Sequence, residues 1–291
     1  MRRHCREVIH RAGDFADVDM YNVFNIGRGR HGKYRETSVM KKKLNRRNSR
    51  AKFSRLAHAN FDNTCNVVHP TFANGMQPEN DDQARAEERN FIRRLARVYK
   101  KYGVPFRYLA TGHRGEKSGR YNYHILVPGG VPVADIIAAW GLGRCNVDPL
   151  QFVESGINDL IKYIGRDADE LDDDDGDDGA DLSIWKKRYI CSQGLRDTEP
   201  EYNNRVARKD MEYIASQVYE AGMISTDGKK FIAKRYPGYD VAEAFVTRSE
   251  VIGGTYVRLR LYKPDSPLLK WRKKINSRTL AKMLAGDGVG L

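Results

Sequence analysis

The alternation of apolar and polar residues predicts several β-strands in the middle of the chain. In "RYNYHILV", residues 120–127, successive side chains point to opposite faces of a strand. One face then carries Tyr121, Tyr123, Ile125 and Val127, and the other carries Arg120, Asn122, His124 and Leu126. The first set suits a protein core, which leaves Asn122 and His124 on the open face. Strands are also predicted at 18–26, 65–73 and 106–113, and the last of these forms a hairpin with 120–127.

Apolar residues at helical spacing predict the clearest helix at 81–102, which Asn80 or Asp81 can cap and Gly103 ends. Shorter helices are predicted at 133–141, 150–167 and 208–222, and 243–263 predicts a hairpin. In the helix at 150–167, Leu160, Ile161 and Ile164 point inward, whereas Tyr163 lies on a different face. This order of elements predicts an α+β fold in which helices flank an antiparallel central sheet.

The charge of the chain points to a polyanionic partner. The 291 residues carry a net charge of +13, although residues 167–181 hold ten acids and no Lys or Arg. Without those ten acids the net charge rises from +13 to +23. A basic surface of this size indicates nucleic acid as the simplest partner. The alternatives are a soluble protein with a basic, solvated surface and an RNA-binding protein built on an RRM-like sheet.

Two stretches hold all the candidate DNA-binding residues except Lys162, which lies in the helix predicted at 150–167. The segment 28–55 has twelve Lys or Arg and one acid, and its second half fits a basic helix that lies on a phosphate backbone or simply faces solvent. In the C-terminal hairpin, Tyr and Arg alternate on one face, where they can stack on bases and contact phosphates. The candidates are Arg46, Arg47, Arg50, Lys52, Arg55, Lys162, Arg258 and Arg260.

Other sequence features argue against several kinds of site. "GRGRHGKY", residues 27–34, has the glycine spacing of a phosphate-binding loop, but Tyr34 replaces the Ser or Thr that would hold magnesium, so we expect no nucleotide cofactor. The four cysteines are widely separated, which argues against a zinc site and a disulfide framework. Because no signal peptide or membrane-spanning run is visible, we expect a cytoplasmic protein without a membrane partner.

The ordered set "RYNYHILV", "WGLGRCNVDPL" and "LIKYIGRD" resembles the HUH-type rolling-circle replication initiators of microvirus-like single-stranded DNA phages and related bacterial mobile elements. Those proteins carry a His-x-His strand, a Trp-Gly segment and a helix with Tyr-x-x-Lys. Stretches such as "SRAKFSRLAHANFDN", "FIRRLARVYKKYG" and "GGTYVRLRLYK" extend the resemblance over most of the chain apart from the acidic run.

The resemblance implies an HUH-endonuclease fold of RRM/ferredoxin-like architecture in a bacterial host cell. It implies a basic N-terminal arm at 1–55 and a DNA-nicking domain at 56–291. An acidic mobile loop at 167–182 interrupts this domain, which ends with a helix and hairpin at 204–263. The implied activity is a metal-dependent endonuclease that nicks single-stranded origin DNA, forms a 5′-phosphotyrosyl link and leaves a 3′ hydroxyl. Host DNA polymerase and helicase are the implied further partners.

Residue roles follow only where positions match. Tyr163 matches the nucleophile, and Arg166 stands where the family usually has Lys. His124 matches the second His of the metal pair, Asn122 replaces the first, and His113 falls where relatives carry a third ligand for Mg²⁺ or Mn²⁺. An amide oxygen can bind a hard cation but lacks the affinity of imidazole for transition metals. The alternative is therefore a DNA-binding protein with a decayed metal site and no nicking activity.

Overall fold

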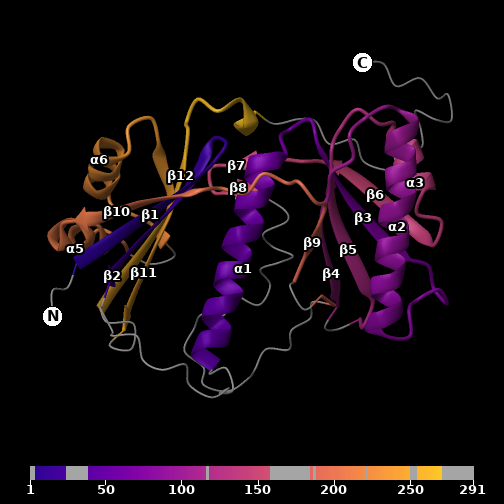
Figure 1. Cartoon of the computed structure of the whole chain (residues 1–291), viewed down its shortest axis with the longest axis horizontal. Coiled ribbons are helices and arrows are strands. Elements are labelled where there is room, and N and C mark those ends of the chain that lie inside the picture. Colours follow the sequence, from indigo (N-terminus) through magenta and orange to yellow (C-terminus); the bar gives the residue numbers. More distant parts are fainter. Residues whose placement is uncertain are drawn as a thin grey trace.

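The fold is described from a computed structural model of the chain. The structure describes residues 4–23, 39–115, 118–157, 184–185, 188–219, 222–249 and 254–270, except for the side chains of 39–44, 46, 47 and 249. In these residues, two five-stranded sheets face each other and one long helix lies between them (Figure 1). Every strand pair in both sheets is antiparallel.

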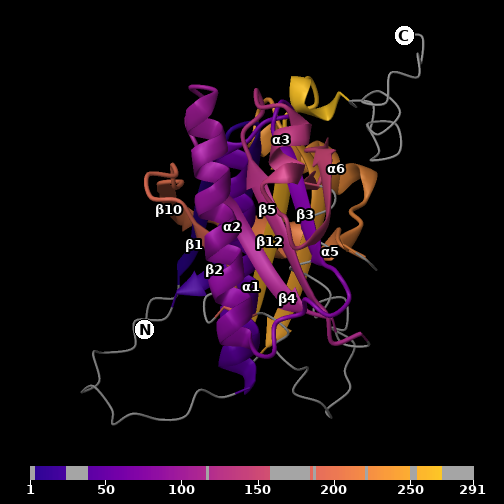
Figure 2. The same ribbon diagram turned by 90° about the vertical axis from the view of Figure 1, so that its right-hand side faces the viewer.

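Sheet B is built from the middle of the chain, with the strand order β6-β3-β5-β4-β9. Its strands are β3 (Asn66–Phe72), β4 (Leu109–Arg114), β5 (Tyr121–Val127), β6 (Gly143–Pro149) and β9 (Ile190–Cys191). Helices α2 (Asp81–Lys101) and α3 (Val133–Ala138) cover its outer face, which Figure 2 turns toward the viewer. The core between them includes the fully buried Phe91, Leu95, Tyr123 and Trp140.

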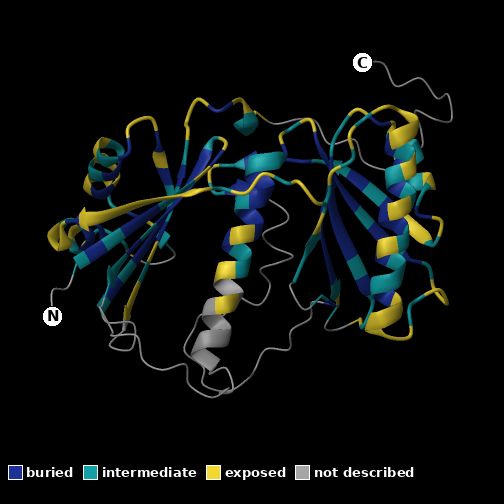
Figure 3. Cartoon of the chain, in the orientation of Figure 1, coloured by how far each residue is buried: buried dark blue, intermediate teal, exposed yellow. Residues whose placement is uncertain are grey.

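Helix α2 shows how the local sequence sets an element's ends and its orientation. The side chain of Asn80 accepts a hydrogen bond from the backbone N–H of Gln83 at 3.0 Å, which caps the first turn. The helix ends just before Gly103, as its sequence predicts. Its apolar residues face sheet B and most of its charged residues face solvent (Figure 3), whereas Glu88 is buried with the apolar residues.

Sheet A joins the two ends of the described chain, with the strand order β10-β1-β2-β12-β11. Its strands are β1 (His4–Ala12), β2 (Phe15–Val23), β10 (Pro200–Val206), β11 (Asp240–Ser249) and β12 (Gly254–Tyr262). Helices α5 (Arg208–Ser216) and α6 (Thr226–Arg235) cover its outer face. Residues 4–23 therefore lie in a folded sheet with the C-terminal hairpin, whereas the sequence predicts a basic arm at 1–55.

Helix α1 (Val39–Asn60) lies between the two sheets. Its last turns hold the buried Phe53, Leu56 and Ala57, which join side chains from both sheets in a third core. The hairpin of β7 (Phe152–Val153) and β8 (Gly156–Ile157) packs into this core. The C-terminal half of α1 is thus an integral part of the fold, and the short 3-10 helix η2 (Pro267–Leu269) lies nearby.

The α+β class and the antiparallel pairing are confirmed, with two sheets in place of one central sheet. The strand at 65–73, the hairpins at 106–127 and 243–263, and the helices that begin at 81, 133 and 208 are also confirmed. The prediction of a helix at 150–167 is wrong for 150–157, of which 152–157 form the hairpin of β7 and β8, and residues 158–167 lie outside the described residues. Within the described ranges, no helix has the length and apolarity to span a membrane.

Candidate functional site

Strand β5 places its polar side chains on the inner face of sheet B, as the alternation predicts. Tyr121, Tyr123, Ile125 and Val127 lie in the core under α2, so Asn122 and His124 face the space that contains α1. The register of the neighbouring strand β4 pairs His113 with Asn122 and Thr111 with His124. The sequence could not fix this register, and it brings His113 to the same patch as His124.

A third histidine, His69 on β3, completes this patch. Val68 pairs with Ile125 and Thr71 with Asn122, so His69 lies across from His124. The Nδ1 atoms of His69 and His124 are 2.7 Å apart. The rings of His113 and His124 are stacked, with an interplanar angle of 4° and centroids 5.2 Å apart. We call His69, His113 and His124, with Asn122, the histidine site.

Sequence reasoning missed His69, although a signal for it is present. In "NVVHPTF" the residues that alternate with the buried Val68 are Val67, His69 and Thr71, so the pattern alone places His69 on the open face. What the pattern does not give is the partner strand. Once β3 pairs with β5, His69 becomes the nearest imidazole to His124.

Groups around the histidine site orient it and hold it partly away from water. His124 is 5% exposed, while His69 and His113 are half-buried. The Nε2 atom of His69 lies 3.7 Å from a carboxylate oxygen of Asp148 on β6. The hydroxyl of Thr111, beside His124, is buried and has no hydrogen-bond partner in the described part of the chain. The site is therefore a polar patch next to the buried apolar Val67, Leu109 and Leu126 of the same face.

The donor chemistry of the patch suits a cation, although no complete metal site is formed. Among the residues that the structure describes, no group of three or more His, Cys, Asp and Glu side chains is arranged to hold a metal ion. Two imidazole nitrogens 2.7 Å apart cannot both carry a proton toward each other. They can share one proton, or both present lone pairs to one cation, which binds neutral imidazole.

Three of the predicted functional residues lie outside the described residues: Lys162, Tyr163 and Arg166. The predicted nucleophile and its neighbours therefore stay predictions, and the site is built without them. The side chains of Arg46 and Arg47 lie outside the described part as well. The side chain of Lys52 on α1 is half-exposed and forms an ion pair with Asp197 at 3.2 Å. The DNA-binding roles of Lys52 and Arg50 stay predictions.

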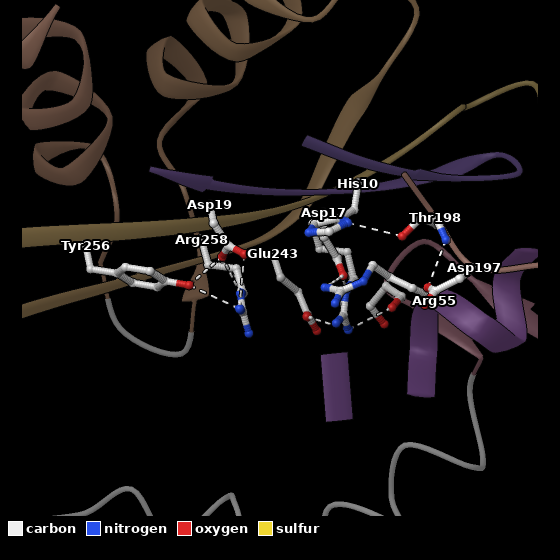
Figure 4. Close-up of polar contacts among 11 residues, drawn as sticks. His10, Asp17, Asp19, Arg55, Asp197, Thr198, Glu243, Tyr256 and Arg258 are labelled. Carbon is white, nitrogen blue, oxygen red and sulfur yellow. Dashed lines mark hydrogen bonds and ion pairs between the residues drawn. The ribbon is translucent and has the colours of Figure 1, made fainter. Parts of the chain in front are cut away.

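The other predicted DNA-binding arginines are held in ion pairs on the inner face of sheet A (Figure 4). Arg258 donates to both carboxylate oxygens of Asp19, at 2.7 and 3.2 Å. Arg260 lies between Asp17 and Glu243, at 3.4 and 3.5 Å. From helix α1, Arg55 reaches the same Asp17 at 3.7 Å.

These ion pairs give the three arginines a structural role. Burial lowers the pKa of Arg258, but the charge and hydrogen bonds of Asp19 raise it by a larger amount. The pKa of Arg258 therefore lies above its ordinary value. At 8% exposure, its guanidinium contacts protein carboxylate instead of solvent. Arg55, Arg258 and Arg260 therefore tie helix α1 and the strands of sheet A together, a role that the sequence did not predict.

Comparisons of this chain with protein-family models, with curated proteins and with solved structures give no match. The functional conclusion therefore depends on the geometry of the histidine site and on the motifs of the sequence.

Proposed function

We propose that this protein is a replication initiator that nicks single-stranded origin DNA through Tyr163. One observation carries the proposal. The register of β3, β4 and β5 brings His69 and His113 next to His124, and His113, Asn122 and His124 are the residues that match the metal positions of the resembled family. Three histidines brought together from three strands on one open sheet face are more consistent with chemistry than with packing.

The topology of sheet B supports the same proposal. Its first four strands and two helices follow the chain order β-α-β-β-α-β, and the strands lie in the spatial order fourth, first, third, second. This is the ferredoxin-like arrangement, in which both helices pack on one face and leave the other open. The HUH-type architecture that the motifs imply is a member of this class, with its histidine strand in the middle of the sheet, as β5 is here.

The reaction would be a transesterification. The phenol of Tyr163 gives up its proton as its oxygen attacks a phosphodiester phosphorus, a bond forms between tyrosine and the 5′ phosphate, and the bond to the 3′ oxygen breaks. The 3′ oxygen takes up a proton and becomes the hydroxyl from which host polymerase, with a helicase, extends. Because the phosphotyrosyl link keeps the bond energy, the strand can be resealed without a nucleotide cofactor.

An ordinary tyrosine has a pKa of about 10 and is a weak nucleophile at neutral pH, so the site must lower the barrier in another way. Mg²⁺ or Mn²⁺ bound by His124, His113 and Asn122, with His69 beside them, would supply Lewis acidity at the scissile phosphate. A neutral imidazole binds a cation and a protonated one does not, so we expect cation binding to weaken at low pH.

The test is formation of a covalent adduct with single-stranded origin DNA in the presence of Mn²⁺ or Mg²⁺. We expect Tyr163→Phe to abolish the adduct and to leave DNA affinity within a few-fold of wild type, because only one hydroxyl is lost. Tyr202→Phe removes the hydroxyl of an exposed tyrosine on β10 and serves as the matched control, with adduct formation unchanged. An adduct that persists in Tyr163→Phe would show that another tyrosine is the nucleophile.

The second candidate is a DNA-binding protein that does not nick. It is favoured by Asn122, whose amide nitrogen donates to the carbonyl of Arg120 at 3.1 Å in the place of a ligating imidazole. Origin binding by the wild-type protein without any adduct, in Mg²⁺ and in Mn²⁺, would establish this candidate and exclude the nickase.

A further inference from the structure

Sheet A carries aromatic side chains on its inner face, away from the histidine site. Tyr21 on β2 lies directly across from Tyr256 on β12, with near-parallel rings whose centroids are 6.3 Å apart. In the next row of the sheet, Phe245 on the edge strand β11 lies across from Arg258. We call Tyr21, Tyr256 and Phe245 the aromatic patch.

The patch is accessible, although its neighbours are buried. Phe245 is 42% exposed, whereas the adjacent Ala244 is fully buried on the opposite face, against α5 and α6. Tyr21 and Tyr256 are half-buried. The exposed phenylalanine and the two half-buried tyrosines share one face of sheet A, where they offer apolar rings to flat apolar groups of a partner.

The ion-pair network of Figure 4 fixes the orientation of one member of the patch, Tyr256. The hydroxyl of Tyr256 donates to Asp19 at 2.5 Å, and Arg258 donates to the same hydroxyl oxygen at 3.1 Å. The ring of Tyr256 is therefore held in place before any ligand arrives. Because Arg258 also neutralises Asp19, this carboxylate does not leave the patch with a net negative charge that would repel phosphate.

Positive charge borders the patch. Arg6 on β1 lies across from Tyr21, on the side away from Tyr256. Its guanidinium donates to Asn204 at 2.6 Å and lies 5.9 Å from the ring of Tyr202, which is 62% exposed. The chain as a whole carries a net charge of +13. Flat apolar rings next to a cation match the bases and phosphates of a single strand of nucleic acid.

We propose that the aromatic patch of sheet A binds single-stranded DNA by stacking of its bases on Tyr21, Tyr256 and Phe245, while Arg6 contacts a phosphate. Sheet A then holds the strand and sheet B acts on it. The proposal goes beyond the proposed function, because binding at this patch needs neither Tyr163 nor the histidine site. Loss of DNA binding at the patch and loss of nicking activity can therefore be told apart by experiment.

The experiment compares two labelled oligonucleotides of equal length by fluorescence anisotropy: oligothymidylate, and an abasic strand with the same phosphates but no bases. It is carried out in the full-length Tyr163→Phe protein, so that covalent adduct formation does not contribute. We expect Phe245→Ala and Tyr21→Ala each to weaken oligothymidylate binding by about tenfold, the loss expected for one stacked base. Affinity for the abasic strand should stay unchanged.

Two controls separate stacking from other effects. Tyr21→Phe keeps the ring and should bind like the parent, whereas Tyr102→Ala removes an aromatic ring of comparable exposure next to α2 and should change nothing. Unchanged oligothymidylate affinity in Phe245→Ala and Tyr21→Ala, or an equal loss for both oligonucleotides, would overturn the proposal. So would a concentration-dependent dimer in sedimentation velocity that Phe245→Ala dissociates, because the patch would then be an interface between two copies of the chain.

Discussion

Replacing Glu88 with glutamine should stabilise the protein strongly at neutral pH and only slightly at pH 5. Glu88 lies on α2 and is fully buried in the core under sheet B. The indole N–H of Trp185 donates to its Oε2 at 2.5 Å, and its Oε1 has no hydrogen-bond partner among the residues described. Burial raises the pKa of this carboxyl to about 8, although the bond from Trp185 and the charge of Arg89 oppose the rise.

The sign of the pH dependence follows from this raised pKa. Between the ordinary pKa of 4.5 and about 8, the folded protein keeps a proton on Glu88 that the unfolded chain releases. Stability from this group is therefore fully present below pH 4.5 and is lost as the pH rises toward 8. At about 1.4 kcal/mol per pH unit, the loss between pH 5 and pH 7 is about 2 to 3 kcal/mol. Glutamine has the same shape, keeps an acceptor for Trp185 and does not titrate.

Urea unfolding followed by far-UV circular dichroism at pH 5, 6, 7 and 8 measures the effect. The difference in unfolding free energy between Glu88→Gln and wild type should grow by about 2 to 3 kcal/mol from pH 5 to pH 7. Glu87→Gln, which changes the half-buried neighbouring carboxyl on the same helix, should show no such growth. A difference that stays flat with pH would refute the buried, protonated state of Glu88.

Three more substitutions test other contacts. Asn122→His restores a second imidazole on the open face of β5 and should tighten Mn²⁺ binding in calorimetry, and unchanged affinity would argue against a cation at this position. Gly156→Ala should destabilise the protein by roughly 2 kcal/mol in thermal unfolding, because Gly156 has a φ of +109° and its new methyl would lie 2.5 Å from Nε2 of the buried His58. Arg258→Met should cost about 3 kcal/mol in urea unfolding by leaving the carboxylate of Asp19 without its cation, and a cost near zero would show that the pair is not structural.

The sequence by itself determined the features that depend on neighbouring residues. The two faces of β5 follow from a strand period of two, which the covalent chain imposes, so His124 and Asn122 could be placed on the open face without a structure. The bounds of α2 follow from its apolar spacing and from the cap at Asn80, both set within a few residues. The local sequence was therefore enough to predict features that depend on a single helix or strand.

The tertiary structure decided whatever depends on pairing between distant segments. His69 and His124 are 55 positions apart, and only the register of β3 on β5 brings their rings together. Arg258 and Asp19 are 239 positions apart, so the sequence could not show that Arg258, a predicted DNA-binding residue, forms an ion pair inside the fold.

The hairpin at 152–157 shows the same limit for secondary structure. The sequence predicts these residues as part of a helix at 150–167, but Phe152 and Ile157 instead join the core beside α1, and Gly156 packs on the ring of His58. Burial of these side chains against partners distant in sequence outweighs a weak helical propensity, which is a free-energy difference of a few tenths of a kcal/mol per residue. Local sequence reports such propensities, whereas the contacts that override them exist only in the folded chain.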